Sequence, residues 1–379
     1  PGTYPAIVNK AATPKITITE SDGTYLVTIT SDTADADIYY TLDGTEPSVA
    51  STKSTEYSKA FKLSKTCTVK AIAVYDGYKD SKVASQKINE KAASIEKAKV
   101  KLSKSKYTYD GEAKKPTAIV TLDGKELEKN KDYTVSYKNN KNIGKATVTI
   151  TGINNYEGKV KKTFTIAVKT GKTFTSGSNK YKVTTSATVS FMGLKNTKAT
   201  KVTIPKTVKY GGKTFKVTSI ADKALKGKTK VTQVTIGANV TSIGSSAFAG
   251  CTKLAKVTIG SKVKTIGVSA FEGCKKLSKV TVGSAVTTIE DKAFKNCIAL
   301  KSITIPAKVT TIDKQAFYGC KNLKTITIKS TKLKTVGKEA FKKINAKATI
   351  KVPKKKLTAY KKLLKGKGQG SKVTIVKYN

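Results

Sequence analysis

The second half of the chain is built from one short hydrophobic pattern that recurs at nearly constant spacing. The unit reads L-x-x-V-T-I-x-x-x-V-x-x-I-x-x-x-A-F-x-G-C, and its clearest copy runs from Leu254 to Cys274. Inside that copy Val257 and Ile259 alternate with Lys256 and Thr258, which is typical of a short strand with one buried face. A unit of this size cannot bury its own apolar face, so neighbouring units are predicted to stack as a solenoid around one continuous core.

The register of the repeat is fixed by its aromatic position. The repeat Phe falls at Phe248, Phe271, Phe294, Phe317 and Phe341, and Leu225 takes this place one unit earlier. Successive positions are 23 residues apart, except for a last spacing of 24 that places one extra residue near Thr331. We therefore expect about six repeats of 23 residues over residues 201–347, with a parallel sheet along one face and a small loop at the extra residue.

Both ends of such an array need caps, because a bare terminal unit would expose apolar surface. Residues 169–200 are predicted to be a linker and N-terminal cap, with strands at Tyr181–Thr185 and Thr188–Phe191. The first repeat carries an insert in which Gly211-Gly212 indicates a two-residue hairpin. Residues 348–379 are predicted to be the C-terminal cap, with a short helix after Pro353 and a last strand at Lys372–Lys377.

The first 168 residues show a different pattern, with short alternating strands separated by turn signals. Asp43-Gly44 and Asp76-Gly77 are such signals in residues 1–90, and Asp123-Gly124 is one in residues 91–168. Strand spacing of this kind favours two immunoglobulin-like β-sandwiches. The predicted fold class is therefore mostly β and multidomain: two sandwiches, then a repeat solenoid with β caps and a short C-terminal helix.

Charge is distributed unevenly along the chain. All 73 basic residues are Lys, and there is no Arg, His or Trp; the formal net charge is +48. Residues 169–379 hold 46 Lys and 6 acidic residues, a net charge of +40, whereas residues 1–90 are nearly neutral. A charge of this size favours polyanions and makes binding dependent on salt. A solvated, soluble surface explains the same count equally well.

The composition argues against an enzyme. Without His there is no imidazole base, and no phosphate-binding loop motif is present. The adjacent Glu290 and Asp291 occupy a repeat position that Gly267 and Val268 fill one unit earlier. We expect no catalytic residue, no cofactor and no metal site. The carboxylates of Asp32, Asp35 and Asp37 lack the ligand spacing of a calcium loop.

Four of the five cysteines follow the repeat. Cys251, Cys274, Cys297 and Cys320 each lie three residues after the repeat Phe. Stacked units could bring neighbouring cysteines within disulfide distance, but buried free thiols that act as small core residues are favoured. Cys67 falls in a predicted strand, which favours a core position for it as well.

Three families share these patterns. The repeat unit resembles the BspA-type leucine-rich repeats of bacterial surface proteins. The stretch IYYTLDGTEPS at Ile38–Ser48 resembles the C-terminal domain of chitobiase and β-hexosaminidase enzymes, an accessory module. The pattern KDYTVSYKNNKNIGKATVTITGINNYEG resembles immunoglobulin-like repeats of Gram-positive surface proteins. These resemblances imply a non-catalytic, adhesin-like protein that is extracellular, at the cell surface or bound to the cell wall.

Two sets of residues are candidates for ligand binding. The outward positions of the repeat strands form a series of hydroxyl and ammonium groups, although Thr is also a common outward strand residue. The members of this series that we select are Lys256, Thr258, Lys279, Thr281, Thr304, Thr325 and Thr327. The aromatic candidates for stacking on sugar rings are Tyr39, Tyr75 and Tyr78, although strand alternation places Tyr39 and Tyr40 on opposite faces and favours a core position for one of them.

The expected partner is a host matrix protein or an anionic polysaccharide or wall polymer. Nucleic acid would bind nonspecifically through charge alone. No run of apolar residues is long enough for membrane insertion. The alternative function is that of a carbohydrate-binding accessory region in a larger secreted glycosidase, which rests on the N-terminal resemblance.

Overall fold

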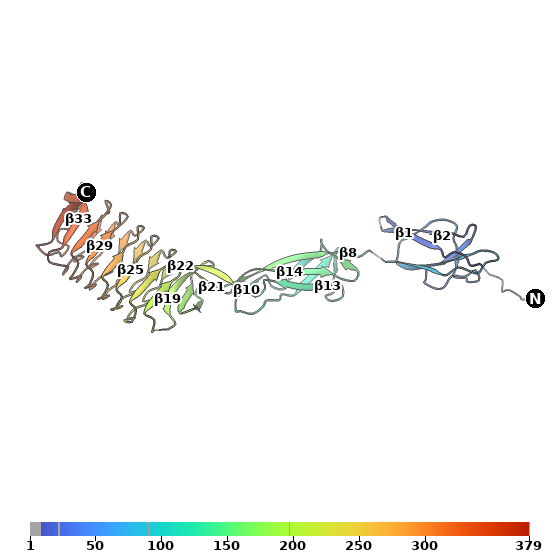
Figure 1. The fold of residues 1–379 in the computed structure, drawn as a ribbon, viewed down its shortest axis with the longest axis horizontal. Coiled ribbons are helices and arrows are strands. Elements are labelled where there is room, and N and C mark those ends of the chain that lie inside the picture. The colour runs from blue at the N-terminus through green and yellow to red at the C-terminus, as the bar shows by residue number, and fades with distance from the viewer. Residues whose placement is uncertain (1–8, 22, 90, 197, 379) are drawn as a thin grey trace, which may run out of the picture. The chain divides into compact units, whose positions relative to one another are not determined.

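The computed structural model describes residues 9–21, 23–89, 91–196 and 198–378. Strands take up 42% of the chain and helices 3%, so the predicted mostly-β fold class with a C-terminal solenoid and a short last helix is confirmed (Figure 1). The chain divides into two compact units. One comprises residues 1–103, 118–136 and 148–162, and the other comprises residues 104–117, 137–147 and 163–379.

Residues 9–89 form two sheets that share one core. The sheet orders are β1-β2-β5 and β4-β3-β6-β7. Buried side chains from both sheets, among them Val27, Ile29, Val69 and Ala71, pack in a single cluster, as a sandwich requires. The strands are β1 (Lys15–Ser21), β2 (Thr24–Thr30), β3 (Asp37–Thr41), β4 (Thr55–Glu56), β5 (Phe61–Leu63), β6 (Cys67–Val74) and β7 (Ala84–Ile88).

Residues 91–168 contain a further set of strands in the sheet orders β10-β16-β14-β13 and β12-β11-β9, with the pair β15-β8. Ala146, Val148 and Ile150 are buried at alternate positions of one strand, as the sequence pattern predicts. The strands are β8 (Ala93–Ser94), β9 (Lys99–Leu102), β10 (Lys106–Thr108), β11 (Ala118–Leu122), β12 (Lys125–Glu126), β13 (Tyr133–Lys138), β14 (Gly144–Gly152), β15 (Tyr156–Glu157) and β16 (Lys159–Ala167).

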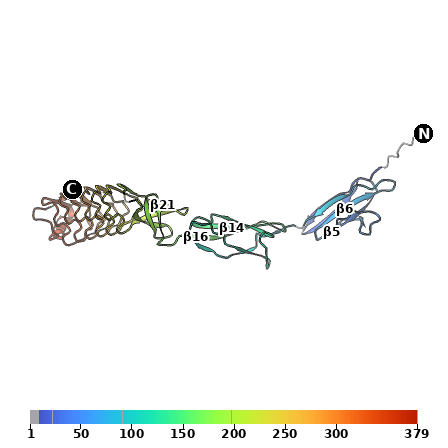
Figure 2. The same cartoon turned by 90° about the horizontal axis from the view of Figure 1, so that it is seen from below.

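The solenoid has two ladders of parallel strands, one on each side of its core (Figures 1 and 2). The first ladder contains the strands predicted from the V-T-I motif and continues into the predicted C-terminal cap. The V-T-I strands are β20 (Lys201–Ile204), β23 (Gln233–Ile236), β25 (Lys256–Thr258), β27 (Lys279–Thr281), β29 (Ser302–Ile305) and β31 (Thr325–Ile328), and the cap strands are β33 (Thr349–Pro353) and β34 (Thr374–Tyr378). It is split into the sheets β20-β23-β25-β27 and β29-β31-β33-β34.

The second ladder belongs to a continuous ten-stranded sheet. Most of its repeat strands are only two residues long, yet they pair in strict register, with Ile243 opposite Ile266 and Ile266 opposite Ile289. The strands are β17 (Thr173–Ser176), β18 (Asn179–Val183), β19 (Thr188–Leu194), β21 (Thr207–Tyr210), β22 (Lys213–Ile220), β24 (Ser242–Ile243), β26 (Thr265–Ile266), β28 (Thr288–Ile289), β30 (Thr311–Ile312) and β32 (Thr335–Val336).

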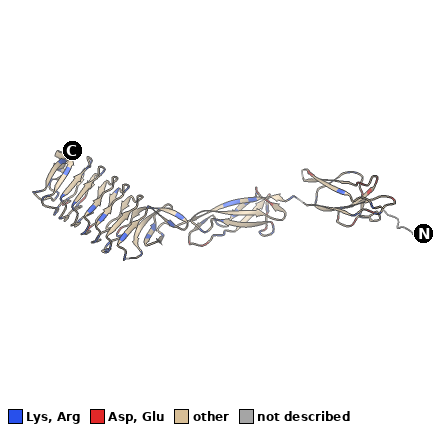
Figure 3. Cartoon of the chain, in the orientation of Figure 1, with Lys and Arg blue, Asp and Glu red and all other residues tan. Residues whose placement is uncertain are grey.

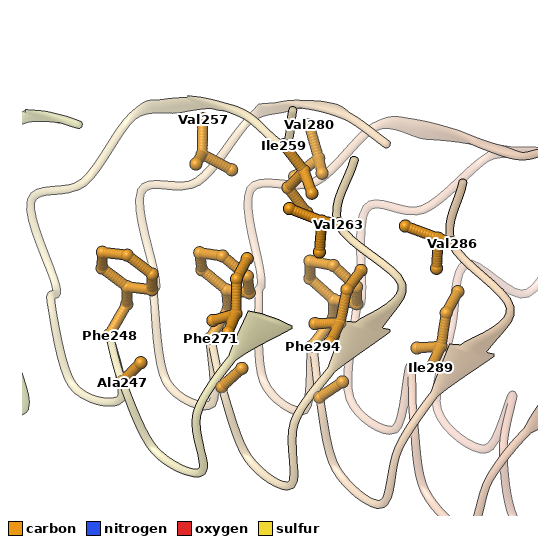
Figure 4. Packing of buried hydrophobic residues seen from close by; sticks show 14 of the residues in the cluster. Ala247, Phe248, Val257, Ile259, Val263, Phe271, Val280, Val286, Ile289 and Phe294 are labelled. Atoms are coloured by element: carbon orange, nitrogen blue, oxygen red, sulfur yellow. The ribbon is translucent and has the colours of Figure 1, made fainter. Parts of the chain in front are cut away.

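The repeat Phe rings stack along the centre of the solenoid. Consecutive ring centroids from Phe248 to Phe341 are 4.9, 5.3, 5.5 and 5.8 Å apart, with interplanar angles of 5° or less. From Phe248 to Phe317 the backbone N–H of each repeat Phe also donates to the next coil, as from Phe271 to the Ala293 carbonyl at 2.8 Å. Figure 4 shows Phe248, Phe271 and Phe294 in line, with the branched side chains of the strands around them.

The caps extend the sheets at both ends. The predicted hairpin forms from β21 and β22, and β19 pairs in parallel with β22, so these strands cover the first coil. Residues 173–176, which the composition places in a linker, form strand β17 because the Phe174 ring packs on Tyr181 and Tyr210.

At the far end, the short helices η1 (Lys354–Lys356) and α1 (Leu357–Leu364) follow β33. Strand β34 then pairs in parallel with β33. Tyr360 and Leu364 of α1 are buried, so the predicted apolar face of the helix covers the last coil.

Candidate binding surfaces

The outward side chains of the V-T-I strands form two straight rows, which together we call the strand face. In the first sheet Lys201, Gln233, Lys256 and Lys279 lie opposite one another in parallel register, and so do Thr203, Thr235, Thr258 and Thr281. In the second sheet Ser302 pairs with Thr325 and Thr304 pairs with Thr327. Neighbouring strands in a sheet are about 4.8 Å apart, so these groups recur at that spacing.

The structure places all seven predicted solenoid residues on this face. Lys256, Thr258, Lys279, Thr281 and Thr304 are exposed, and Thr325 and Thr327 are half-buried. The burial pattern of β25 and of β27 is exposed, buried, exposed, which matches the predicted alternation. Whether these residues bind a ligand remains a prediction.

Acidic residues are confined to a different part of the solenoid. We call the segments within four residues of a repeat Phe, or of Leu225, the Phe edge. Every acidic residue of positions 169–379 falls in one of these segments: Asp222, Glu272, Glu290, Asp291, Asp313 and Glu339. Sequence analysis missed this restriction, although aligning the acidic residues with the repeat shows it directly.

Several of these carboxylates bridge neighbouring coils. Asp222 Oδ1 accepts a hydrogen bond from the Ser245 backbone N–H at 2.7 Å, and Asp291 Oδ1 accepts one from the Lys314 N–H at 3.1 Å. Glu290 Oε2 accepts a hydrogen bond from the Val268 backbone N–H at 3.0 Å. Three of the six acidic side chains of the solenoid therefore accept hydrogen bonds from its own backbone. Burial, together with the nearby Asp291, raises the pKa of Asp313.

The strand face consequently carries ammonium groups with no carboxylate among them (Figure 3). In the described ranges one ion pair of the solenoid is found, between Lys342 and Glu339 at 2.5 Å, and it lies on the Phe edge. Lys256 and Lys279 lie directly opposite each other, an arrangement of like charges that is unfavourable unless an anion lies between them.

The tyrosine candidates do not form one site. Tyr75 and Tyr78 meet edge to face with ring centroids 5.1 Å apart, because the Asp76-Gly77 turn joins them and the Tyr78 N–H donates to the Tyr75 carbonyl. Both residues are more than one-third exposed. Tyr39 instead lies in β3 opposite Ile72 and Glu56, and its strand neighbour Tyr40 stacks on Phe61 in the core.

The repeat cysteines are buried free thiols. Each donates its S–H to a carbonyl of the preceding coil, as from Cys274 to Phe248 at 3.2 Å and from Cys320 to Phe294 at 3.1 Å. Burial raises the pKa of Cys251 to about 11 and that of Cys320 to about 12, and also raises the pKa of Cys274 and Cys297. These thiols are core groups that stay protonated at neutral pH.

Two further properties concern the described residues as a whole. They contain no group of three or more side chains that could hold a metal ion. None of their helices has the length and apolar character needed to span a membrane.

Two family models match the chain. Residues 188–286 and 218–347 match the BspA type leucine rich repeat region, in six copies. Residues 27–88 match the Fn3 associated family, which supports in part the domain type predicted for this region. Neither model describes a catalytic family. No curated protein matches the chain significantly.

Solved structures of bacterial repeat proteins are similar to part of the chain. A leucine-rich cell surface protein from Faecalibacterium prausnitzii is 20% identical, over 56% of this chain and 77% of its own, with a TM-score of 0.31. A leucine-rich repeat protein of T. pallidum is 20% identical, over 54% and 86%, with a TM-score of 0.34.

A protein from Bacteroides capillosus is 25% identical, over 41% of this chain and 97% of its own, with a TM-score of 0.29. Residues 188–347, which hold the 23-residue repeats of the solenoid, therefore match the BspA type leucine rich repeat region.

Proposed function

We propose that this protein is a non-catalytic, adhesin-like binding protein of the bacterial cell surface, and that its solenoid binds an anionic polymer along the strand face. The observation that supports this most is the separation of charge. Acidic residues are kept to the Phe edge, while in-register Lys and Thr line the strand face.

A repeating ligand fits a repeating surface. Ammonium groups attract sulfate, phosphate or carboxylate groups, and the Thr hydroxyls of the next row can donate to the same polymer. A single small anion would contact only one or two neighbouring strands of this face. A polymer gains from every coil, because each further contact forms at high effective concentration.

The test measures binding of the full chain to teichoic acid, polygalacturonate, heparin and neutral dextran at about 0.15 M and about 0.5 M salt. One arm replaces two strand-face lysines (Lys256→Gln with Lys279→Gln). The matched control removes the same charge from the Phe edge (Lys226→Gln with Lys314→Gln). We expect the first variant to bind an anionic polymer about 3- to 30-fold more weakly, which corresponds to two exposed ion pairs.

The control variant should retain affinity to within about twofold, since its charges lie off the strand face. Equal weakening of both variants would show that only net charge matters and would reject a defined face. A matrix protein such as fibronectin included in the panel tests the other partner class. Its binding in preference to every polymer would replace the polymer assignment.

A second candidate function rests on the exposed Tyr75 and Tyr78 pair in the region that matches the Fn3 associated family. Aromatic rings with free faces can stack on sugar rings, so this domain could serve a glycan-binding accessory role. Replacement of Tyr75 by Ala should then abolish retention on a glycan that the strand-face variant still binds.

A further inference from the structure

A cavity lies at the N-terminal end of the solenoid, away from the predicted residues of the strand face. Its volume is about 500 Å³, within the range of small-molecule sites. The β17–β18 turn forms one side of it, and β20 with the start of β21 forms the other. All of these residues belong to the same compact unit.

The inner end of the cavity carries a fixed pair of polar groups. Asn179 Nδ2 donates to the Tyr181 hydroxyl at 3.0 Å and to the Thr203 carbonyl at 2.9 Å, so both of its protons are used. The Asn179 Oδ1 remains as an acceptor. In the described part of the chain the Tyr181 hydroxyl has this one partner, so its own proton remains available to a ligand.

Packing holds the Tyr181 side chain rigidly. The residue is 1% exposed, and its ring contacts Phe174 and Phe191 at centroid distances of 5.5 and 6.1 Å. Burial raises the pKa of Tyr181, so its hydroxyl stays protonated and donates at neutral pH. A donor and an acceptor held side by side in this way suit two neighbouring hydroxyl groups of a ligand. One ligand hydroxyl can accept from the Tyr181 hydroxyl, and the other can donate to Asn179 Oδ1.

The remaining walls add charge and apolar surface. Lys201 and Lys209 line the cavity, and no Asp or Glu is found among the described residues that line it. The buried side chains of Leu194, Val202 and Val208 supply an apolar wall. Hydroxyl-binding groups, an apolar wall and two ammonium groups match a sugar or polyol that carries one negative group.

We propose that this cavity is a binding site for a monomeric anionic sugar or polyol, in which Tyr181 and Asn179 hold the hydroxyl groups and Lys201 and Lys209 hold the anion. The negative group is either a carboxylate or a phosphate. The site shares Lys201 with the end of the strand face, whereas Tyr181, Asn179 and Lys209 lie outside that face, so the site does not depend on polymer binding.

The experiment follows the side-chain resonances of labelled tyrosine in the full chain by NMR. Glucuronate and N-acetylneuraminate test the carboxylate, glycerol 3-phosphate and ribitol 5-phosphate test the phosphate, and glucose and ribitol are the uncharged controls. We expect saturable shifts at Tyr181 with at least one anionic compound. Tyr181→Phe keeps the ring packing but lacks this resonance, so the affinities of all variants are compared by isothermal titration calorimetry. It should weaken binding of that compound about 3- to 10-fold, the effect of one hydrogen bond.

Lys201→Gln with Lys209→Gln should weaken the same compound and remove the salt dependence of its affinity. The Lys256→Gln with Lys279→Gln variant serves as control and should bind it unchanged. Because Tyr181→Phe leaves the strand face intact, it should bind polymers like the wild type, so either proposal can fail alone. The proposal would be overturned if none of the four anions shifted the Tyr181 resonances. It would also be overturned if glucose or ribitol shifted them as strongly as the anions do.

Discussion

The hydroxyl of Tyr360 in the C-terminal helix donates to the Ser330 carbonyl at 3.0 Å and accepts from the Leu333 N–H at 3.0 Å. Both partners belong to the loop that holds the one extra residue of the 24-residue repeat. Ser330 and Leu333 are buried, and Ser330 also bonds the Val309 carbonyl at 2.6 Å. One side chain of the cap therefore satisfies the backbone at the only irregular step among the last five repeat spacings.

The first prediction concerns this contact. Tyr360→Phe should lower the free energy of unfolding by about 1–3 kcal/mol, because the buried Leu333 N–H loses its acceptor. Urea unfolding followed by circular dichroism measures the change. Tyr378→Phe at the end of β34 is the control and should change stability by less than about 0.5 kcal/mol. Equal effects of the two substitutions would contradict the bridging role.

The stacked Phe core gives a second prediction. Phe294→Ala should destabilise the solenoid by about 3–5 kcal/mol, since it leaves a cavity between the rings of Phe271 and Phe317. Phe294→Leu keeps most of the volume and should cost less. A calorimetric comparison of the two variants checks this order, and a larger loss in the Leu variant would mean that the central ring does not fill the core.

The third prediction is a pH dependence. Burial raises the pKa of Cys251 from 9.0 to about 11, so between these pH values the folded state binds more protons than the unfolded state. The stabilisation is complete below pH 9 and falls as the pH rises, by about 2–3 kcal/mol at pH 11. Stability curves of the wild type and of Cys251→Ala should therefore converge toward pH 11, and parallel curves would show that the thiol does not titrate this way.

The hairpin tip provides a fourth prediction. Gly211 has φ of +55°, and a Cβ there would lie 2.7 Å from Ile143 Cδ1 and 2.7 Å from Tyr109 Cζ. Gly227 has φ of +70° but open space around it. Gly211→Ala should thus destabilise the second unit more than Gly227→Ala, which reports the backbone cost alone. Thermal unfolding of both variants measures the difference. Equal melting temperatures would show that the close approach of Ile143 and Tyr109 to residue 211 does not limit the side chain there.

Sequence patterning predicts the solenoid well because its signal is repeated. The positions of Val257, Ile259 and Phe271 hold apolar residues in every copy, so their inward direction and their register follow from spacing alone. The two-residue strand at Thr265–Ile266 was not predicted, since alternation over two residues gives no detectable period. Strand β17 was missed because a composition rich in Gly, Ser, Thr and Lys conceals the one buried side chain, Phe174.

The candidate sites were predictable to different degrees. The outward positions Lys256 and Thr258 follow directly from strand alternation. The Tyr75–Tyr78 pair needed the geometry of the turn between them, and the separation of Tyr39 from that pair needed the pairing of β3 with β6. The cavity beside Tyr181 unites two segments that only the folded cap brings together, so the sequence alone does not indicate it.

The salt dependence of polymer affinity tests the central claim most directly. Affinity of the full chain for its preferred anionic polymer is measured from about 0.05 to about 0.5 M salt, for the wild type, the Lys256→Gln with Lys279→Gln variant and the Lys226→Gln with Lys314→Gln variant. Each lysine that contacts the polymer adds to the slope of log affinity against log salt. The account predicts a shallower slope for the strand-face variant and a wild-type slope for the Phe-edge variant. Identical slopes for the two variants, or no loss of affinity in the strand-face variant, would contradict it.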